Sequence, residues 1–167
     1  MRAAGKLDVG INVGGNAGVN FNKLLNPYDQ LTVGADVLWD VNGASGGMQI
    51  NPNVTYKTPV SKAALVILNV GARHVDDDYA KYYYSVNATQ SANSGLPLYN
   101  AKGGWDSWHT AMIVGYDLSG DLRDGGFEVF LFGNYMRMLN DASATPYTSI
   151  RGSANNWTGG VGVGYTF

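Results

Sequence analysis

Repeated alternation of apolar and polar residues constrains this chain more than any other feature of its sequence. Between Leu31 and Val41 every second side chain is apolar, and the intervening positions are mostly polar residues or glycine. Successive side chains of a β-strand point to opposite faces, so a period of two predicts a strand with one apolar face. The same pattern predicts six more strands, near residues 7–22, 48–57, 64–73, 105–118, 126–139 and 160–167. We therefore predict an all-β, antiparallel protein of about seven strands.

The composition suits a β-protein in an unusual solvent. Only 14% of the residues are charged, against about 25% in soluble domains, while 23 are glycine and 20 are aromatic. The longest apolar run, Ala63 to Leu68, is far shorter than the roughly 18 residues of a membrane helix. The absence of cysteine excludes disulfides and thiolate metal sites. The net charge of −2 provides no broad basic surface for nucleic acid.

Alternation fits a soluble barrel with its apolar face inside and a membrane barrel with that face outside. Two features favour the membrane. The polar face carries amides, hydroxyls and glycines, as in a polar lumen, rather than the Lys and Glu of a soluble surface. The long polar links, 78–104 and 140–156, fall at one end, while the short links 23–29, 58–62 and 119–125 fall at the other. Bacterial outer-membrane barrels have this asymmetry, although the short link 42–46 on the long side does not add to it.

The C-terminal strand gives a third indication. It ends in alternating Val161, Val163, Tyr165 and Phe167, which resembles the signal read by the outer-membrane barrel-assembly machinery. Tyr and Trp also recur near the predicted strand ends, as interfacial girdles require. Within the third strand Pro52 lacks a backbone donor, so we expect a β-bulge there.

The segment after the fourth strand carries specific motifs. His74-Val75-Asp76-Asp77-Asp78-Tyr79 is followed by Tyr82-Tyr83-Tyr84-Ser85-Val86 and then by Ala88-Thr89-Gln90-Ser91-Ala92-Asn93-Ser94-Gly95-Leu96-Pro97-Leu98-Tyr99. This order, with Leu139-Asn140-Asp141-Ala142-Ser143-Ala144-Thr145-Pro146 and Arg151-Gly152-Ser153 before the last strand, resembles the MipA/OmpV family of outer-membrane proteins. The chain departs from the family at Tyr84-Ser85, where Phe-Gly is common, which puts the local turn geometry in doubt.

The resemblance implies a larger, even-stranded transmembrane β-barrel in the bacterial outer membrane. We therefore expect residues 1–167 to be a single barrel domain that lacks N-terminal strands of its parent, and we find no signal peptide at Met1. The family implies a scaffold in murein maintenance that links a lytic transglycosylase to a murein synthase, with lipid and lipopolysaccharide around it. The alternatives are a porin-like channel or an adhesin, and a soluble ligand-binding barrel. No enzymatic activity and no cofactor is expected.

Three sets of residues are candidates for function. A loop recognition surface is predicted at Asp76, Asp77, Asp78, Tyr79, Tyr82, Tyr83, Tyr84, Leu96 and Tyr99. Charges in the lumen or at its rim are predicted at Arg73, Arg137 and Arg151. The stretch Asp106-Ser107-Trp108-His109 has the residue types of a hydrolytic triad, but alternation places Asp106 on the face opposite Ser107 and His109. A metal site between His74 and His109 is likewise disfavoured, because they lie at opposite ends of a long link.

Overall fold

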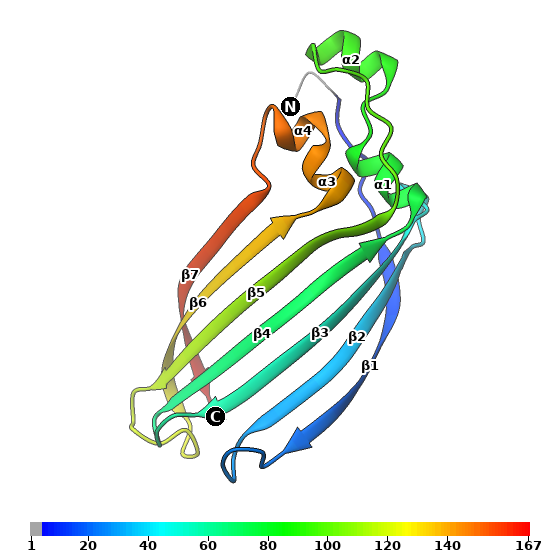
Figure 1. Cartoon of the computed structure of the whole chain (residues 1–167). Coiled ribbons are helices and arrows are strands. Elements are labelled where there is room, and N and C mark those ends of the chain that lie inside the picture. The colour runs from blue at the N-terminus through cyan, green and yellow to red at the C-terminus, as the bar shows by residue number, and fades with distance from the viewer. Residues whose placement is uncertain (1–4) are drawn as a thin grey trace.

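Seven antiparallel strands pair in the order in which they occur in the chain, forming one curved sheet (Figure 1). The structure is a computed structural model that describes residues 5–167. The strands are β1 (Asn12–Asn22), β2 (Gln30–Asp40), β3 (Met48–Pro59), β4 (Ala64–Val75), β5 (Gly104–Asp117), β6 (Gly126–Met138) and β7 (Asn155–Thr166). The prediction of a seven-stranded antiparallel sheet is therefore confirmed. None of the described helices is long and apolar enough to cross a membrane.

The two long links contain short helices, which alternation did not predict. α1 (Asp77–Tyr84) and α2 (Ala88–Ser94) lie between β4 and β5, and α3 (Asn140–Ala144) and α4 (Pro146–Ser149) lie between β6 and β7. Asp76 caps α1 by accepting from the Tyr79 amide, and Asn87 and Gln90 form a capping box on α2. All four helices lie at one end of the sheet, and the short turns after β1, β3 and β5 lie at the other (Figure 1). The predicted division of long and short links is confirmed.

The sheet has two chemically different faces. Residues that are partners across neighbouring strands share a face. The registers therefore place the alternating apolar residues of the other strands on the same face as the series from Leu31 to Trp39. A shallow cavity of about 380 Å³ on the other face is lined by residues of β2 to β6, among them Asp36, Asn53 and His109. A cavity that spans five strands marks this polar face as the concave one. The apolar face is therefore the convex one.

The concave face also carries an apolar patch near the turn end. It consists of Leu65, Ile67, Ile113, Phe130 and Phe132, which the registers place side by side on β4, β5 and β6. The two phenylalanine rings lie over Gly162 and Gly160 of β7, where a Cβ atom would come within 2.2 and 2.6 Å of a ring carbon. These inward apolar residues explain why β5 and β6 read as apolar on both faces.

Two strand boundaries and one bulge differ from expectation. β1 begins at Asn12 rather than near residue 7, and β7 begins at Asn155 rather than near residue 160. A strand is set by its backbone ladder hydrogen bonds, which can be missing where side chains alternate and present where they do not. The bulge predicted at Pro52 is wrong. Pairing with β4 skips Asn51 and Pro52, but the register is the same on both sides of the gap. The proline removes local pairing without inserting a residue.

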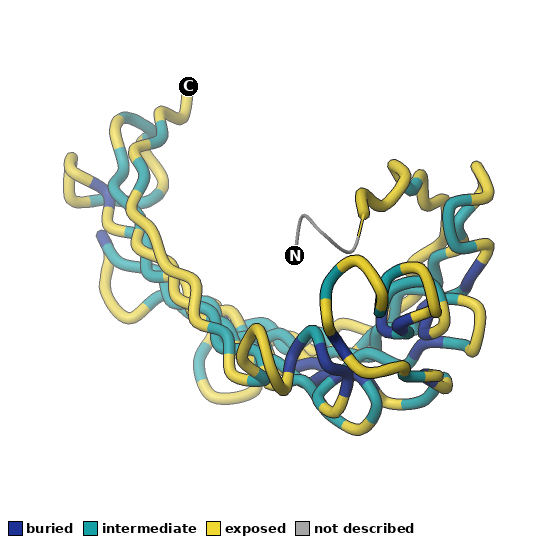
Figure 2. Tube along the Cα trace, turned by 90° about the horizontal axis from the view of Figure 1, so that it is seen from above, coloured by how far each residue is buried: buried dark blue, intermediate teal, exposed yellow. Residues whose placement is uncertain are grey.

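The sheet is open along its two outer strands, as the view from above shows (Figure 2). Within residues 5–167, β1 pairs only with β2 and β7 pairs only with β6. Hydrophobic burial is concentrated under the helices instead. The buried cluster there consists of Val75, Ala80, Tyr84, Ala101 and Ala142.

Candidate functional site

A β-bulge on β5 begins the candidate site. Arg73 of β4 pairs with Ser107, whereas the next residue, His74, pairs with Trp105, so Asp106 is the extra residue. An inserted residue breaks the alternation of side chains. Asp106 and Ser107 are therefore both buried on the concave side, at 4% and 2% exposure. Our prediction that Asp106 faces away from Ser107 is wrong for this reason.

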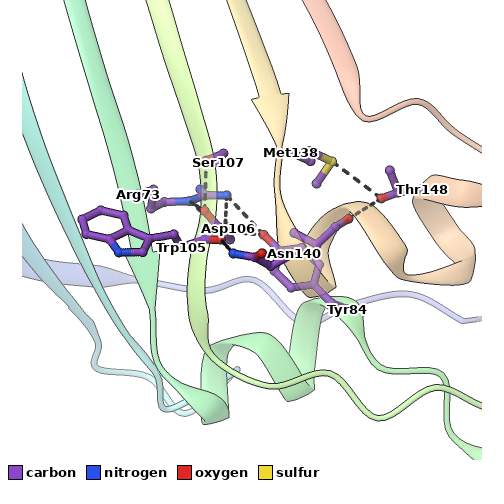
Figure 3. Close-up of polar contacts among 9 residues, drawn as sticks. Arg73, Tyr84, Trp105, Asp106, Ser107, Met138, Asn140 and Thr148 are labelled. Atoms are coloured by element: carbon purple, nitrogen blue, oxygen red, sulfur yellow. Dashed lines mark hydrogen bonds and ion pairs between the residues drawn. The ribbon is translucent and has the colours of Figure 1, made fainter.

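Asp106 is the centre of a buried polar cluster (Figure 3). Arg73 Nε donates to the two carboxylate oxygens at 2.9 and 3.1 Å, and its Nη2 lies 2.8 Å from Oδ2. The hydroxyl of Tyr84 donates to Oδ2 at 2.6 Å, and Ser107 Oγ donates to Oδ1 at 2.9 Å. The carboxylate is thus compensated by one guanidinium and two hydroxyls, as a buried charge requires.

Tyr84 carries this cluster from the sheet into the helical end. Burial raises the pKa of Tyr84 far above its ordinary value against the opposing effect of Arg73, and the Asp106 carboxylate adds to the rise. The hydroxyl therefore stays protonated and donates. The Thr145 hydroxyl in turn donates to the Tyr84 carbonyl at 2.5 Å. The chain from Arg73 to Thr145 ties β4, β5, α1 and the start of α4 together.

Further bonds hold the second helical segment over the same place (Figure 3). Asn140 Nδ2 donates to the Trp105 carbonyl at 2.8 Å, and Thr148 Oγ1 donates to the Ala142 carbonyl at 2.8 Å. The backbone N–H of Leu139 donates to the Asp106 carbonyl at 2.8 Å. The helices are therefore a fixed cover over the end of the sheet, anchored at the bulge.

Asp106, Ser107 and His109 do not form a catalytic triad. His109 Nε2 lies 2.9 Å from Asn69 Oδ1, and within residues 5–167 no hydrogen bond joins His109 to Ser107. Asp106 orients Arg73 and Tyr84 instead of a histidine. Nor does a two-histidine metal site form, because His109 lies on the concave face and His74 on the convex face, where it packs edge-on against Trp105 at 5.4 Å.

The predicted recognition surface divides into residues that hold the fold and residues that line a cavity. Asp76 accepts from the backbone amides of Met48 and Tyr79, and Asp77 accepts from that of Gly103. Tyr84 and Leu96 are buried. The rings of Tyr79, Tyr82 and Tyr83 pack on one another at 4.5 to 4.9 Å between centroids.

One exposed member and two partly buried members line a cavity. Asp78, Tyr82 and Tyr99 lie on the wall of a cavity of about 790 Å³ between α1, α2 and the strand-like segment that precedes β5. The sequence motif predicted which segment is exposed but could not separate the residues that hold the fold from those that line the cavity, because both kinds occur next to each other on α1.

The three arginines do not lie together. Arg73 lies in the concave cluster. Arg137 pairs with Trp108 and Asn155 on the convex face, near the helical end of β6, so it does not lie on the concave face; of the two predicted positions only the rim remains. Its guanidinium donates to Asn155 at 3.2 Å beside the Tyr135 hydroxyl. Arg151 is exposed in the link between α4 and β7.

The C-terminal residues lie along the convex edge of the sheet. Val161, Val163 and Tyr165 share a face with Leu131, Val129 and Phe127 of β6, and all three are more than half exposed. Phe167 follows β7 at the turn end and is fully exposed.

At the turn end, Asp29 organises the link between β1 and β2. Its carboxylate accepts from the backbone amides of Leu24, Leu25 and Asn26 at 2.7 to 3.1 Å. Tyr56 of β3 donates its hydroxyl to the same carboxylate at 2.8 Å. The turn is thereby held in one shape while Leu25 and Tyr28 project outward, 83% and 77% exposed. Alternation located this turn but gave no sign of the carboxylate that holds it.

Comparison with known proteins agrees with the motifs of the α1–α2 segment. The family model described as MltA-interacting protein MipA matches residues 2–167. The proteins named MltA-interacting protein from Escherichia coli (strain K12) and from Shigella flexneri are each 24% identical to this chain over 132 residues, which is 79% of this chain and 42% of each relative. The matched part of the chain thus spans about two fifths of the length of these curated relatives. No solved structure matches it. With nearly its whole length matched by that family model, the chain belongs to the MipA family.

Proposed function

We propose that residues 1–167 are part of an outer-membrane β-barrel that serves as a scaffold in murein maintenance. The observation that carries the membrane part is a pair of aromatic belts on the convex face. Near the helical end the belt consists of Trp39, Trp105, Trp108, Tyr135 and Trp157, and near the turn end of Phe21, Tyr56, Tyr116, Phe127 and Tyr165. Neighbouring rings pack on each other: the ring centroids of Tyr135 and Trp157 lie 4.6 Å apart, and those of Phe127 and Tyr165 lie 4.9 Å apart.

The surface between the belts suits lipid. The registers place only apolar residues, glycine, proline and Thr110 there, without a charged side chain, while Arg137 lies beyond the belt at the helical end. Tyr116 lies eight positions after Trp108, which is about 26 Å along a strand. At a tilt of about 40° this is about 20 Å along a barrel axis, close to the apolar band of about 25 Å in outer-membrane barrels.

Refolding into lipid vesicles tests the membrane part. Leu131 lies between the belts on β6, and Asn134 lies on the concave face of the same strand. We expect Leu131→Arg to destabilise the folded barrel by about 2–4 kcal/mol, the cost of an arginine at the bilayer midplane. The matched change Asn134→Arg faces the polar side and should refold like the wild type. Equal refolding of both variants would contradict a lipid-facing convex surface.

The scaffold part rests on family membership and on the turn end. The relatives are named for an interaction with MltA. A protein partner needs a preformed surface with large side chains, since aromatic anchors supply most of the affinity of interfaces. Tyr28 and Leu25 on the Asp29-held turn provide such a surface. Outer-membrane barrels have their short turns in the periplasm, so we propose that this end faces the periplasm, where a lytic transglycosylase and a murein synthase act. The barrel-assembly machinery and lipopolysaccharide are further proposed partners.

Capture of a purified lytic transglycosylase by the full-length protein tests this contact. We expect the double change Leu25→Ser and Tyr28→Ser to weaken capture by at least ten-fold, because two exposed anchors are lost. The control is Leu98→Ser, which alters another exposed leucine at the helical end. Unchanged capture by the turn variant would remove the turn end from the interface, and no capture by the wild type would refute the scaffold function.

A porin-like channel is the second candidate, because the concave face presents the polar cavity lined by Asp36, Asn53 and His109. Conductance of the full-length protein in planar bilayers tests it directly. If the protein is a channel, α1 and α3 lie over the mouth of the pore. A variant that opens the helical cover at the bulge, such as Asp106→Ala, should then have a higher conductance than the wild type. An absence of channels in wild type and variant alike would refute it.

A further inference from the structure

We propose that the cavity between α1 and α2 is a binding site for an oligosaccharide. The cavity measures about 790 Å³ and lies at the helical end, on the opposite side of the molecule from the proposed partner surface. Its size falls within the range of sites that enclose small organic ligands, about 300–1,000 Å³. The inference does not depend on the proposed function, since it concerns other residues at the other end of the sheet.

Several polar groups that line this cavity have no hydrogen-bond partner among the described residues. Among the described residues, the carboxylate of Asp78, the ammonium group of Lys81 and the amide of Asn100 have no hydrogen-bond partner. Asn87 and Gln90 accept from each other's backbone amides through their side-chain oxygens, which leaves both NH₂ groups available. Donors and acceptors therefore converge on one space from two helices and a following segment.

The cavity also offers aromatic surface. Tyr82 and Tyr99 both line it, and Tyr82 is held in place because its ring packs against Tyr83 at 4.9 Å and its hydroxyl accepts from the Asp8 amide at 2.8 Å. A sugar ring presents C–H groups on its faces and hydroxyls on its rim. The faces pack on aromatic rings, and the hydroxyls pair with amides and carboxylates.

The charges of the cavity narrow the ligand class. Among residues 5–167, Asp78 and Lys81 are the only charged residues that line the cavity, and their opposite charges balance. A nucleic acid needs a basic surface, and an extended peptide commonly adds to a free strand edge, neither of which this cavity provides. A neutral, polyhydroxylated ligand fits both the balanced charge and the unpaired amides. Two sources supply uncharged sugar residues of this kind, the hexoses of the outer core of lipopolysaccharide and the N-acetylglucosamine residues of murein glycan strands.

Isothermal titration calorimetry of the full-length protein in lauryldimethylamine oxide, a detergent without a sugar head group, tests the proposal. One arm uses the lipid-free core oligosaccharide released from lipopolysaccharide, and the other uses short glycan strands prepared from murein. We expect one of the two to bind, and the arm that binds identifies the source. Binding by neither preparation would overturn the proposal.

Matched variants locate the binding. We expect Tyr82→Ala to weaken binding about ten-fold through the lost stacking surface, and Asn100→Ala to weaken it about five-fold through a lost hydrogen bond. Tyr82→Phe keeps the ring and should bind within about two-fold of the wild type. Asn93→Ala removes an exposed amide of α2 that does not line the cavity and should bind unchanged. Full binding by Tyr82→Ala and Asn100→Ala would place the sugar elsewhere and overturn the proposal.

Discussion

Replacing Asp106 by alanine should release the helical cover while leaving the sheet intact. Asp106 accepts from Arg73, Tyr84 and Ser107, and its removal deprives the buried end of Arg73 of its only ion-pair partner within residues 5–167. Of these donors, Tyr84 belongs to α1. The loss is therefore expected where α1 meets β4 and β5.

The size of the effect follows from the burial of the pair. Breaking a buried ion pair by removing one partner costs about 3–5 kcal/mol. The Arg73 side chain retains 27% exposure, so water can take over part of its solvation, and we expect the lower end, about 3 kcal/mol. Since each 1.4 kcal/mol is a factor of ten, this corresponds to an opening equilibrium about 150-fold more favourable.

Hydrogen exchange of the backbone amides measures that opening. The amide of Ala80, which bonds to the Asp76 carbonyl within α1, should exchange about 150-fold faster in Asp106→Ala. Amides in the middle of β3 and β4 should keep their protection. Tyr84→Phe removes only one hydrogen bond to a charge and should give a smaller acceleration at the same amides.

A second aspartate–arginine ion pair provides the control for this experiment. Asp121 and Arg123 also form an ion pair, at 2.6 Å, but Arg123 is 80% exposed in the turn after β5. Asp121→Ala should leave exchange at α1 unchanged, because exposed pairs contribute little. Unaltered exchange of α1 in Asp106→Ala, or equal acceleration throughout the sheet, would refute the idea that the bulge anchors the cover.

Two further predictions concern the turn end and the last strand. Burial favours a higher pKa for Asp29, but the hydrogen bonds from Leu25, Tyr56, Leu24 and Asn26 outweigh it and lower the pKa below the model-peptide value of 3.8. A lowered folded-state pKa stabilises the protein above 3.8 and ceases to do so as the pH falls through the folded value. The urea midpoint of Asp29→Asn should therefore lie below that of the wild type at pH 7, with the gap closing towards pH 2. A gap that is constant with pH would show that ionisation of Asp29 does not contribute. Gly162→Ala should destabilise the protein by about 1–3 kcal/mol, because the new Cβ meets the Phe130 ring at 2.2 Å. Gly115→Ala has no atom within 4 Å of its Cβ and serves as its control in the same urea titrations; equal midpoints for both would contradict the packing of that ring on Gly162.

The sequence by itself determined the strands and most of their faces. Large apolar residues alternate with small or polar ones, as in Leu31 to Trp39. Because neighbouring side chains of a strand point to opposite faces, this alternation determines which residues share each face of the sheet. The same reasoning located the turns and placed the long links at one end. Separately, the motifs of the Asp76–Tyr99 segment resemble one family, which the family match confirms. These features depend on residues close in the chain.

Only the tertiary structure decided what happens where strands and links meet. β5 and β6 are apolar on both faces because Ile113, Phe130 and Phe132 turn inward, so pairing with β4 and β7 was needed to set their phase and to place Arg137 outside. The bulge at Asp106 is a mismatch between two strands, which a single strand's sequence does not reveal. The polar cluster follows from that mismatch, because it brings together Arg73, Tyr84 and Asp106 from separate parts of the chain.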